Sequence, residues 1–331
     1  MKTAVFYGKE DYRVEERPVF AMGEGDVKIR VALSGICGSE LHEYAHGPIL
    51  FCTADSIDPA TGKPVTYCNT GHEFSGIVEE TGSLVTRVKV GDRVTANPLL
   101  GATGSHAEFI VVPESSVYKL PASVSLAEGA LVEATATGLQ AVKNSGLVIG
   151  DSVVVFGAGP IGLAVAACAK AAGAATIISV DISDDRLETA QKMGASHVVN
   201  AGQADALAVI KEILPNGADV VFEAAGAAAT YKQAIQAGKK GGRVVIIAVY
   251  TQEVGWNPFD LAVTGVTMVG SYAYTPETFQ RAIDLMATGQ LKMNPMITGC
   301  IQLKDIVAKG FEALIKDKSH AKILVELSAR K

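Results

Sequence analysis

The sequence is poor in features that define whole classes of protein. Its 331 residues contain only 6% aromatic residues and five cysteines, an odd number without the density or short pairings of a disulfide scaffold. No apolar run approaches the roughly 18 residues needed to span a bilayer. The first residues, MKTAVFYGKEDYRVEE, lack the basic and then apolar pattern of a secretion signal. We therefore expect a cytoplasmic protein with reduced thiols and no membrane partner.

Neither sign of charge is in large excess. Lysine and arginine number 29 against 35 acidic residues, which gives a net charge of -6. This balance offers no electrostatic reason to expect nucleic acid as a partner. The chain also has no solenoid-type repeat and no low-complexity tract. What is present, 48% hydrophobic residues and 34 glycines, is typical of an α/β protein of about two domains.

The pattern of apolar residues changes near residue 140. Before it, short alternating or apolar runs broken by Gly and Pro predict a compact, mostly β domain. From about 145 to 275, strand-like runs alternate with helical stretches, the signature of βαβ units around a parallel sheet. Two helical stretches and a last strand, AKILVEL, follow, and we expect this tail to return to the first domain. The predicted domains are 1–140 with 276–331, and 141–275.

The strongest local motif is GAGPIG at 157–162. It directly follows the buried-type strand SVVVF and opens an alanine-rich helix. The first glycine permits a tight turn, the second lets the backbone approach a pyrophosphate, and the third lets the helix pack on the strand. The helix N-terminus then supplies donors to the phosphates. The predicted cofactor loop comprises Gly157, Gly159, Pro160, Ile161 and Gly162.

Asp181 supports the dinucleotide interpretation of this loop. It closes the next strand, nineteen positions after Gly162. Its carboxylate would accept hydrogen bonds from the adenosine ribose and repel a 2'-phosphate, so NAD is expected in preference to NADP. A lone glycine pattern often marks only a tight turn. Here the strand, helix, spacing and acid agree, and they predict a doubly wound Rossmann domain.

Residues upstream of the loop suggest a metal site. Cys37, His72 and Glu133 offer a thiolate, an imidazole and a carboxylate, the ligand types of zinc. They stand 35 and 61 positions apart, which is not the compact spacing of a zinc finger. Each also has an ordinary structural explanation, as a buried cysteine, a satisfied histidine and a helix-start carboxylate. Local sequence alone leaves both interpretations open.

Longer segments resemble a known family over nearly the whole chain. They are similar to the medium-chain zinc-dependent alcohol and polyol dehydrogenases, and most to the 2,3-butanediol (acetoin) and sorbitol branch. The resemblance implies a mostly β GroES-like catalytic domain beside the Rossmann domain, and a catalytic zinc. The segments are GICGSELHEY, GHEFSGIVEETG, VKVGDRV, LVEATATGLQAV and VVVFGAGPIGLAV for the family, and ELHEYAHGPI, the KPVT run, WNPFDL and GFEALIKDKSHAKILVEL for the branch.

The resemblance gives the candidate ligands their roles. Cys37 and His72 match metal ligands of the family, and Glu133 stands where relatives use Cys, Asp or Glu. Glu73 matches a carboxylate that ligates directly in some relatives and lies behind the metal in others. The Cys37 thiolate and Glu133 already neutralise Zn²⁺, and a third anion would oppose deprotonation of an alcohol. We therefore expect Glu73 to be an outer or transient ligand.

The same likeness implies a reaction and further site residues. The activity is hydride transfer between NAD and a small secondary alcohol or vicinal diol and its ketone. Ser39 resembles the relay hydroxyl and His42 the histidine that passes the proton onward; a turn serine and a surface histidine are the ordinary alternative. Thr137, one helical turn beyond Glu133, is expected to face the nicotinamide. Later strands end near Val249, Tyr250 and Ser271, which fit the nicotinamide border or a loop or core role equally well.

Two departures from the family matter. NPLLGATGSHAEF contains no cysteine where relatives usually carry a four-cysteine lobe, so we expect one catalytic zinc and no structural zinc. The segment before His72 is lengthened and brings Cys68 nearby. A zinc-free quinone or enone reductase of the same fold is the alternative enzyme, and Cys37, His72 and Asp181 argue against it. A non-catalytic dinucleotide sensor or lens-type protein is opposed by Ser39 and His42.

The remaining residues carry weaker expectations. Cys168 lies among alanines and is interpreted as core, and Leu99 and Leu100 match a substrate-pocket position of the family. His106, His197 and His320 have no carboxylate or cysteine pattern beside them and are interpreted as structural or solvated. An edge strand such as TMVGSYAY could pair across a twofold axis, so we expect a homodimer or homotetramer.

Overall fold

The computed structural model describes the chain except for residues 50–52, 55, 58–66, 99–102 and 328–331. The chain divides into two compact units, one formed by Met1–Glu133 with Ile297–Lys331 and the other by Ala134–Met296. Leu99 and Leu100 lie outside the described residues. Within the described part, every helix is too short or too polar to cross a membrane.

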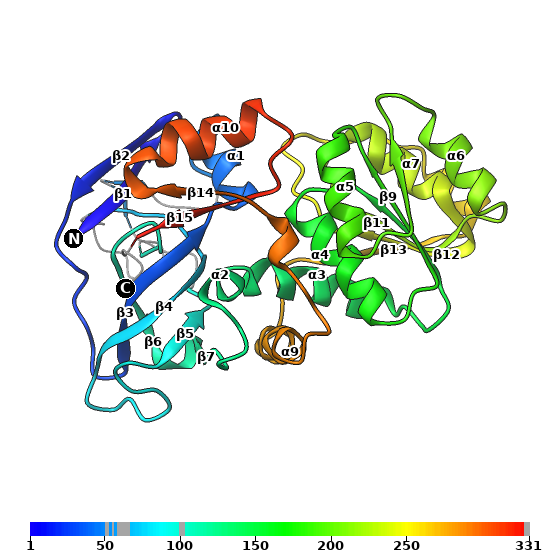
Figure 1. The fold of residues 1–331 in the computed structure, drawn as a ribbon. Helices are drawn as coiled ribbons and strands as arrows, with labels where there is room; N and C mark the ends of the chain where they lie inside the picture. Colours follow the sequence, from blue (N-terminus) through cyan, green and yellow to red (C-terminus); the bar gives the residue numbers. More distant parts are fainter. Residues whose placement is uncertain (50–52, 55, 58–66, 99–102, 328–331) are drawn as a thin grey trace. The chain divides into compact units, whose positions relative to one another are not determined.

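The first unit is built on a seven-stranded mixed sheet (Figure 1). Its strand order is β14-β15-β3-β4-β5-β7, and β6 pairs with β3, while β1 and β2 form a separate antiparallel pair. β3 alternates between fully buried and half-buried side chains, and its Val27, Ile29 and Val31 enter one core. The elements are β1 (Lys2–Gly8), β2 (Asp11–Glu16), β3 (Asp26–Gly35), α1 (Gly38–His46), β4 (Glu73–Thr81), β5 (Arg93–Ala96), β6 (Phe109–Pro113), η1 (Glu114–Ser116), β7 (Val117–Lys119), α2 (Leu126–Gly129), β14 (Ile297–Gln302), η3 (Leu303–Asp305), η4 (Ile306–Phe311), α10 (Glu312–Lys316) and β15 (Lys322–Glu326).

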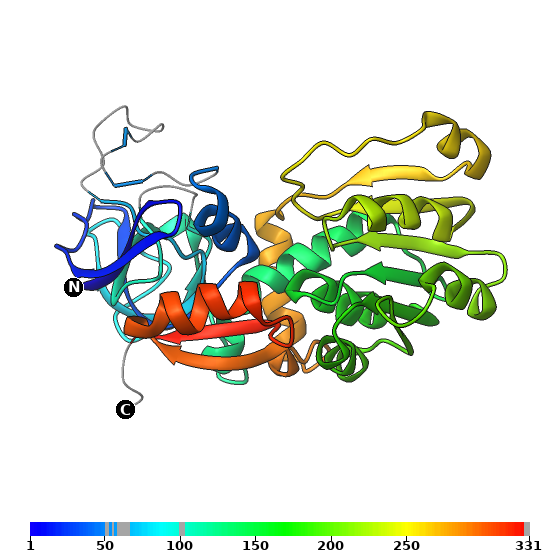
Figure 2. The same ribbon diagram turned by 90° about the horizontal axis from the view of Figure 1, so that it is seen from above.

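The C-terminal segment completes this sheet. β15 pairs antiparallel with β3, with Leu324 opposite Gly35, and β14 pairs parallel with β15 (Figure 2). Ile323, Val325 and Phe311 from this segment are buried in one core with Phe6 and Ile36 from the N-terminal part. The last strand therefore lies beside the end of β3, where the candidate ligand Cys37 follows.

The second unit is a doubly wound parallel sheet. Its six strands run in the order β10-β9-β8-β11-β12-β13 and every pair is parallel. Numbered from β8, this is the order 3-2-1-4-5-6 of the Rossmann fold. The predicted fold class is confirmed. The elements are α3 (Val132–Ser145), β8 (Ser152–Phe156), α4 (Pro160–Ala171), β9 (Thr176–Asp181), α5 (Asp184–Met193), β10 (His197–Asn200), α6 (Ala206–Ile213), β11 (Ala218–Glu223), α7 (Ala228–Ala237), β12 (Gly238–Ile246), α8 (Pro258–Thr264), β13 (Thr267–Gly270), α9 (Pro276–Ala287) and η2 (Asn294–Met296).

Helices cover both faces of the parallel sheet. Val154 and Phe156 of β8 are buried in one core with Ile210 of α6 and Ile235 of α7. On the other face, a Cβ at Gly162 of α4 would lie 3.4 Å from Val155. Burial on both faces explains why β8 reads as a continuous apolar run instead of an alternating one.

The second unit includes α9, which the sequence pattern placed with the tail of the first domain. Phe279 and Ile283 of α9 are fully buried, and the Thr278 hydroxyl donates to Gln140 Oε1 of α3 at 2.7 Å. The apolar spacing of a helix shows that one face is buried but does not show against which partner. The unit limits in the structure are thus 134 and 296, against the expected 141 and 275. The functional role of each unit remains a prediction.

Candidate functional site

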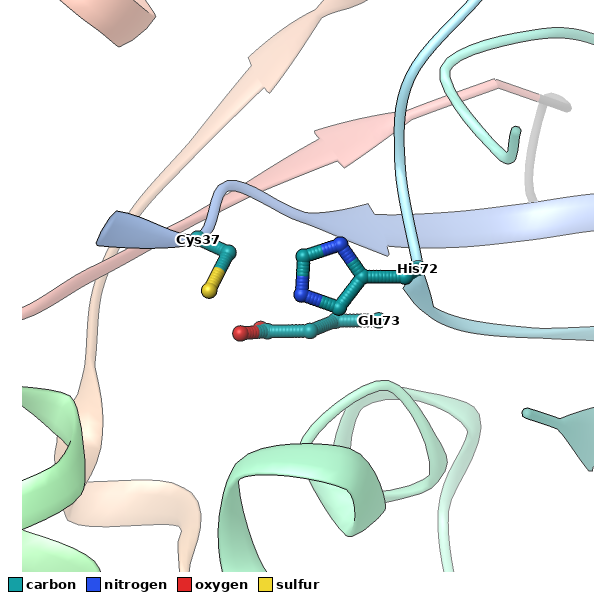
Figure 3. A group of neighbouring side chains, drawn as sticks. All are labelled: Cys37, His72 and Glu73. Atoms are coloured by element: carbon teal, nitrogen blue, oxygen red, sulfur yellow. The ribbon is translucent and has the colours of Figure 1, made fainter. Parts of the chain in front are cut away.

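Cys37, His72 and Glu73 form a compact group of metal-ligating side chains. One ligand atom from each lies within 4.8 Å of the others. Figure 3 shows the thiol, the imidazole and the carboxylate pointing toward one another. Cys37 follows the end of β3, and Glu73 opens β4, opposite Gly35 in the antiparallel pairing. A Cβ at Gly35 would lie 2.5 Å from Glu73 Oε2, so only glycine leaves room for this carboxylate.

Lys322 is a buried cation in contact with this group. Its Nζ donates to Glu73 Oε1 at 2.8 Å, to Glu73 Oε2 at 2.6 Å and to the Ile36 carbonyl oxygen at 3.0 Å. Burial lowers the pKa of Lys322, but Glu73, Cys37 and Glu133 raise it above its ordinary value. The Glu73 charge is therefore offset inside the protein. A lone lysine in the apolar run AKILVEL was a sequence signal that the sequence analysis did not use.

Glu40 links Cys37 and His72 to the helix that follows Cys37. Its Oε2 accepts the Cys37 backbone N–H at 3.0 Å, and its Oε1 lies 3.4 Å from His72 Nδ1. Burial raises the pKa of the Glu40 carboxyl, but His106 and His72 together lower it below its ordinary value. Glu40 thus stays ionised and can hold the His72 ring from its Nδ1 side. Sequence reasoning assigned it no role.

His106 completes this buried network. Its ring lies between Glu40, 3.0 Å from Nε2, and Ser34, 3.0 Å from Nδ1, and its exposed fraction is 0%. The expected structural or solvated histidine is therefore a buried one with a carboxylate partner that is distant in sequence. The spacing of 66 positions between Glu40 and His106 hides the pair from local patterns.

These residues fit a zinc ion. Thiolate, imidazole and carboxylate are the donors that Zn²⁺ prefers. Burial lowers the pKa of His72, but Cys37 and Glu40 raise it well above its ordinary value, so the group attracts a cation. Glu133 is half-buried at the start of α3 and is not in the group of three, although it contributes to the raised pKa of Lys322. Its role as a ligand stays a prediction.

The expected proton relay residues lie on α1. The Ser39 Oγ is buried and makes no hydrogen bond with the described residues, so it can accept a polar partner. His42 is half-buried, and its ring stacks with that of His46 at a centroid distance of 6.2 Å. Burial and the His46 charge lower the pKa of His42, against the opposing effect of Glu43. Cys68 is fully buried and does not belong to the metal-ligating group.

The glycine loop of the second unit has the geometry that its motif predicts. Gly157 has φ +96°, and a Cβ there would lie 2.9 Å from the backbone after β11. A Cβ at Gly162 would lie 1.8 Å from the Gly157 carbonyl oxygen, so α4 requires glycine at this position. A Cβ at Gly159 would meet nothing within 4 Å. The three glycines thus divide into a turn, an open approach and a close packing contact. Pro160 begins α4 and Ile161 is its second residue.

Asp181 closes β9 and turns toward this loop. Its Oδ2 accepts the Ala158 N–H at 2.7 Å, and its Oδ1 accepts the N–H groups of Ile182 and Ser183 at 2.8 and 3.0 Å. The carboxylate therefore lies beside the backbone expected to meet the pyrophosphate.

The other cofactor candidates have defined surroundings. Thr137 is half-buried in α3 and Val249 is 43% exposed after β12. The Ser271 hydroxyl accepts from Asn144 Nδ2 at 3.1 Å, and the Tyr250 hydroxyl donates to Glu223 Oε2. Cys168 is buried in α4, as expected for a core cysteine, and burial raises its pKa to about 12.

Family comparisons match both units. The family model described as "Alcohol dehydrogenase GroES-like domain" matches residues 23–122, and the one described as "Zinc-binding dehydrogenase" matches residues 160–288. The first match contains Cys37, His72 and Glu73, and the second contains Gly162 and Asp181.

Curated relatives are similar over almost their full length. The (R,R)-butanediol dehydrogenase of Bacillus subtilis is 38% identical over 98% of this chain and 99% of its own. Sorbitol dehydrogenase 1 of Saccharomyces cerevisiae is 33% identical, with 91% of each chain covered. The solved structure of 2R,3R-butanediol dehydrogenase from Bacillus subtilis has a TM-score of 0.90 at 36% identity, covering 98% of this chain and 99% of that one. The chain therefore belongs to the medium-chain zinc-dependent alcohol and polyol dehydrogenase family, among the relatives of the butanediol and sorbitol dehydrogenases.

Proposed function

We propose that this protein is an NAD-dependent, zinc-containing dehydrogenase that oxidises a small vicinal diol or secondary alcohol and reduces the matching ketone. The observation that carries the proposal is the group of Cys37, His72 and Glu73, whose ligand atoms lie within 4.8 Å of one another. The substrate class follows the names of its relatives, which are butanediol, xylulose and sorbitol enzymes.

Cys37, His72 and Glu133 are the proposed zinc ligands. Lys322 donates to both oxygens of Glu73, so Glu73 and Lys322 act as a neutral pair. The charge of Zn²⁺ is then balanced by the Cys37 thiolate and Glu133. This charge count favours Glu73 as an outer partner that stays with Lys322, or as a transient ligand.

A zinc ion held there supplies a Lewis acid that makes the substrate hydroxyl more acidic, and NAD accepts the hydride. We assign the Ser39 hydroxyl to take the released proton; its buried Oγ, which has no hydrogen-bond partner among the described residues, supports this role. His42 follows on the same helix and is half-buried, with a lowered pKa. A histidine that is neutral near physiological pH can accept that proton and release it to water.

The proposed NAD site uses the second unit. Gly157, Gly159 and the N-terminus of α4 face the pyrophosphate, and Asp181 binds the adenosine ribose. For the nicotinamide end, we propose Thr137, Val249 and Ser271. Pro160 and Ile161 are the first two residues of α4; Pro160 has no N–H and sets the first turn, and the Ile161 N–H has no intrahelical acceptor and can donate to a phosphate.

Further elements of the proposal concern the whole molecule. We propose a single zinc ion per chain, cytoplasmic residence, and a homodimer or homotetramer. The edge strand β13 pairs with β12 on one side in the described sheet, and Phe259 and Val263 of the neighbouring α8 are 66% and 61% exposed. A second copy of this chain pairing at β13 would extend the sheet and cover apolar surface. Sedimentation analysis of the purified protein should give a dimer or tetramer, and a monomer would overturn this element.

An activity screen with metal analysis tests the proposed function. Purified protein is assayed with NAD and NADP against butanediol stereoisomers, sorbitol, xylitol and simple alcohols, and its zinc content is measured. We expect NAD-dependent oxidation of a vicinal diol or polyol and about one zinc per chain. Two zinc ions would contradict the single-zinc count. Protein free of zinc that reduces quinones or enones with NADPH would overturn the dehydrogenase and establish the reductase alternative.

A further inference from the structure

His106 lies in a buried chain of hydrogen bonds that ends at a proposed zinc ligand. Its Nδ1 is 3.0 Å from Ser34 Oγ, which is 2.7 Å from Ser105 Oγ, and its Nε2 is 3.0 Å from Glu40 Oε2. The side chains of Ser34, Glu40 and His106 are all 0% exposed. These hydrogen bonds are therefore shielded from bulk water. A buried polar chain of this kind fixes the orientation of its members.

Glu40 transmits the position of His106 to the metal-ligating group. Its Oε1 lies 3.4 Å from His72 Nδ1, and its Oε2 also accepts the Cys37 N–H at 3.0 Å. A neutral histidine that binds zinc through Nε2 keeps its hydrogen on Nδ1, where Glu40 can accept it. The other oxygen of Glu40 already accepts the Cys37 N–H and can accept a second donor, which the Nε2–H tautomer of His106 provides. In that tautomer the His106 Nδ1 accepts the Ser34 hydroxyl.

We propose that His106 is a positioning residue of the metal centre, which acts through Glu40 to fix the His72 ring and so increases the affinity of the site for Zn²⁺. This inference rests on the proposed zinc ligands. Without the His106 donor, a buried carboxylate loses one of its partners and can turn away from His72, which releases the ring from its ligating orientation.

The backbone holds His106 in place independently of its ring. Its N–H donates to the Thr70 carbonyl oxygen at 2.9 Å, and its carbonyl oxygen accepts the Ala4 N–H at 2.8 Å. Gly71, with φ +107°, passes so close that a Cβ there would lie 2.6 Å from the His106 nitrogen. The segment before His72 is thus anchored through main-chain contacts. A change of the His106 side chain therefore tests the ring contacts and leaves the backbone anchor unchanged.

A matched pair of variants separates the two ring nitrogens. His106→Gln places an amide nitrogen where Nε2 stood and retains the donor to Glu40, whereas His106→Asn places an amide oxygen where Nδ1 stood and retains the acceptor for Ser34. Zinc affinity of the metal-free protein is measured by competition with a coloured chelator. The visible absorption of bound Co²⁺ reports the ligand geometry. His197→Asn, at an exposed histidine of β10, is the control.

We expect His106→Asn to bind zinc about 10- to 100-fold more weakly than the native protein and to alter the Co²⁺ spectrum. His106→Gln should retain most of the affinity and the native spectrum, and His197→Asn all of it. Native affinity in His106→Asn, or an equal loss in both His106 variants, would overturn the inference. Failure of either His106 variant to fold, judged by thermal unfolding without metal, would also overturn it, because it would mean a structural role. Native protein that binds no zinc would overturn the proposed metal centre itself.

Discussion

The two candidate sites differ in whether side chains or the backbone form them. The metal-ligating group consists of side chains, and the buried carboxylates in and beside it have partners: Glu73 pairs with Lys322, and Glu40 lies 3.0 Å from His106 Nε2. The glycine loop would bind its cofactor through backbone groups, and it depends on the lack of a side chain at Gly157, Gly159 and Gly162. The metal-ligating group should therefore lose its function when one of its side-chain groups is removed. The glycine loop should lose its function when a Cβ is added to one of its glycines.

The largest expected effect comes from removing the thiol of the first site. Cys37→Ala should lose bound zinc and reduce turnover by about four powers of ten, or about 5 kcal/mol of transition-state stabilisation. NAD binding, measured by calorimetry, should persist because the loop lies in the other unit. Cys300→Ala, at an exposed cysteine, is the control and should retain activity and zinc. Retention of zinc by Cys37→Ala would contradict the proposed ligand set.

Lys322→Met tests the pairing of buried charges in the same site. Glu73 would be left buried without its cation, which should lower the free energy of unfolding by about 3–5 kcal/mol in urea denaturation. The double variant Glu73→Gln with Lys322→Met should recover part of this loss, since it leaves no unpaired charge. Lys304→Met, at an exposed lysine, should change the stability little. A single Lys322 variant as stable as that control would contradict the pairing argument.

Substitution by alanine should distinguish the roles of two glycines of the loop. Gly159→Ala should leave the unfolding transition unchanged, because its Cβ would meet nothing within 4 Å, and should weaken NAD binding by about 2 kcal/mol, or roughly 30-fold. Gly162→Ala should instead destabilise the protein, because its Cβ would lie 1.8 Å from a carbonyl oxygen. Calorimetric NAD titrations and urea unfolding of both variants check this. Equal NAD affinity in Gly159→Ala and the native protein would contradict the proposed role of Gly159 in binding the pyrophosphate.

Asp181 is the one charged side chain assigned to the loop. Its substitution should have a smaller effect than the substitutions described above. Asp181→Ser removes the acceptor for the ribose and the charge that repels a 2'-phosphate, so the preference for NAD over NADP should fall about tenfold, or about 1.4 kcal/mol. The ratio of kcat/KM for the two cofactors measures it. Asp185→Ser, at an exposed acid on the neighbouring α5, should leave the ratio unchanged. An unchanged ratio in Asp181→Ser as well would remove this account of cofactor choice.

The same contrast explains which residues the sequence analysis found. GAGPIG and Asp181 lie within one βαβ unit, and the structure has the strand, turn and helix that their spacing predicts. Cys37 and His72 were recognisable by ligand type and resemblance. Glu40 and His106 were not recognisable, because they contact each other across 66 positions of the chain. Lys322 stands out as a lysine in an apolar run, but its partner Glu73 lies 249 positions away. The position of α9 was misjudged for the same reason, since its burial in the second unit depends on its contact with α3.

The sequence by itself determined the Rossmann fold, the turn geometry of the glycine loop and the types of zinc ligand available, because these depend on local periodicity, conformational freedom and side-chain chemistry. Only the tertiary structure decided which charges meet. The antiparallel pairing of β3 with β4 and β15 brings Glu73 and Lys322 together from 249 positions apart, and the packing of the segment around His106 places its ring against Glu40. Buried charges require partners, and the partner is chosen by the fold.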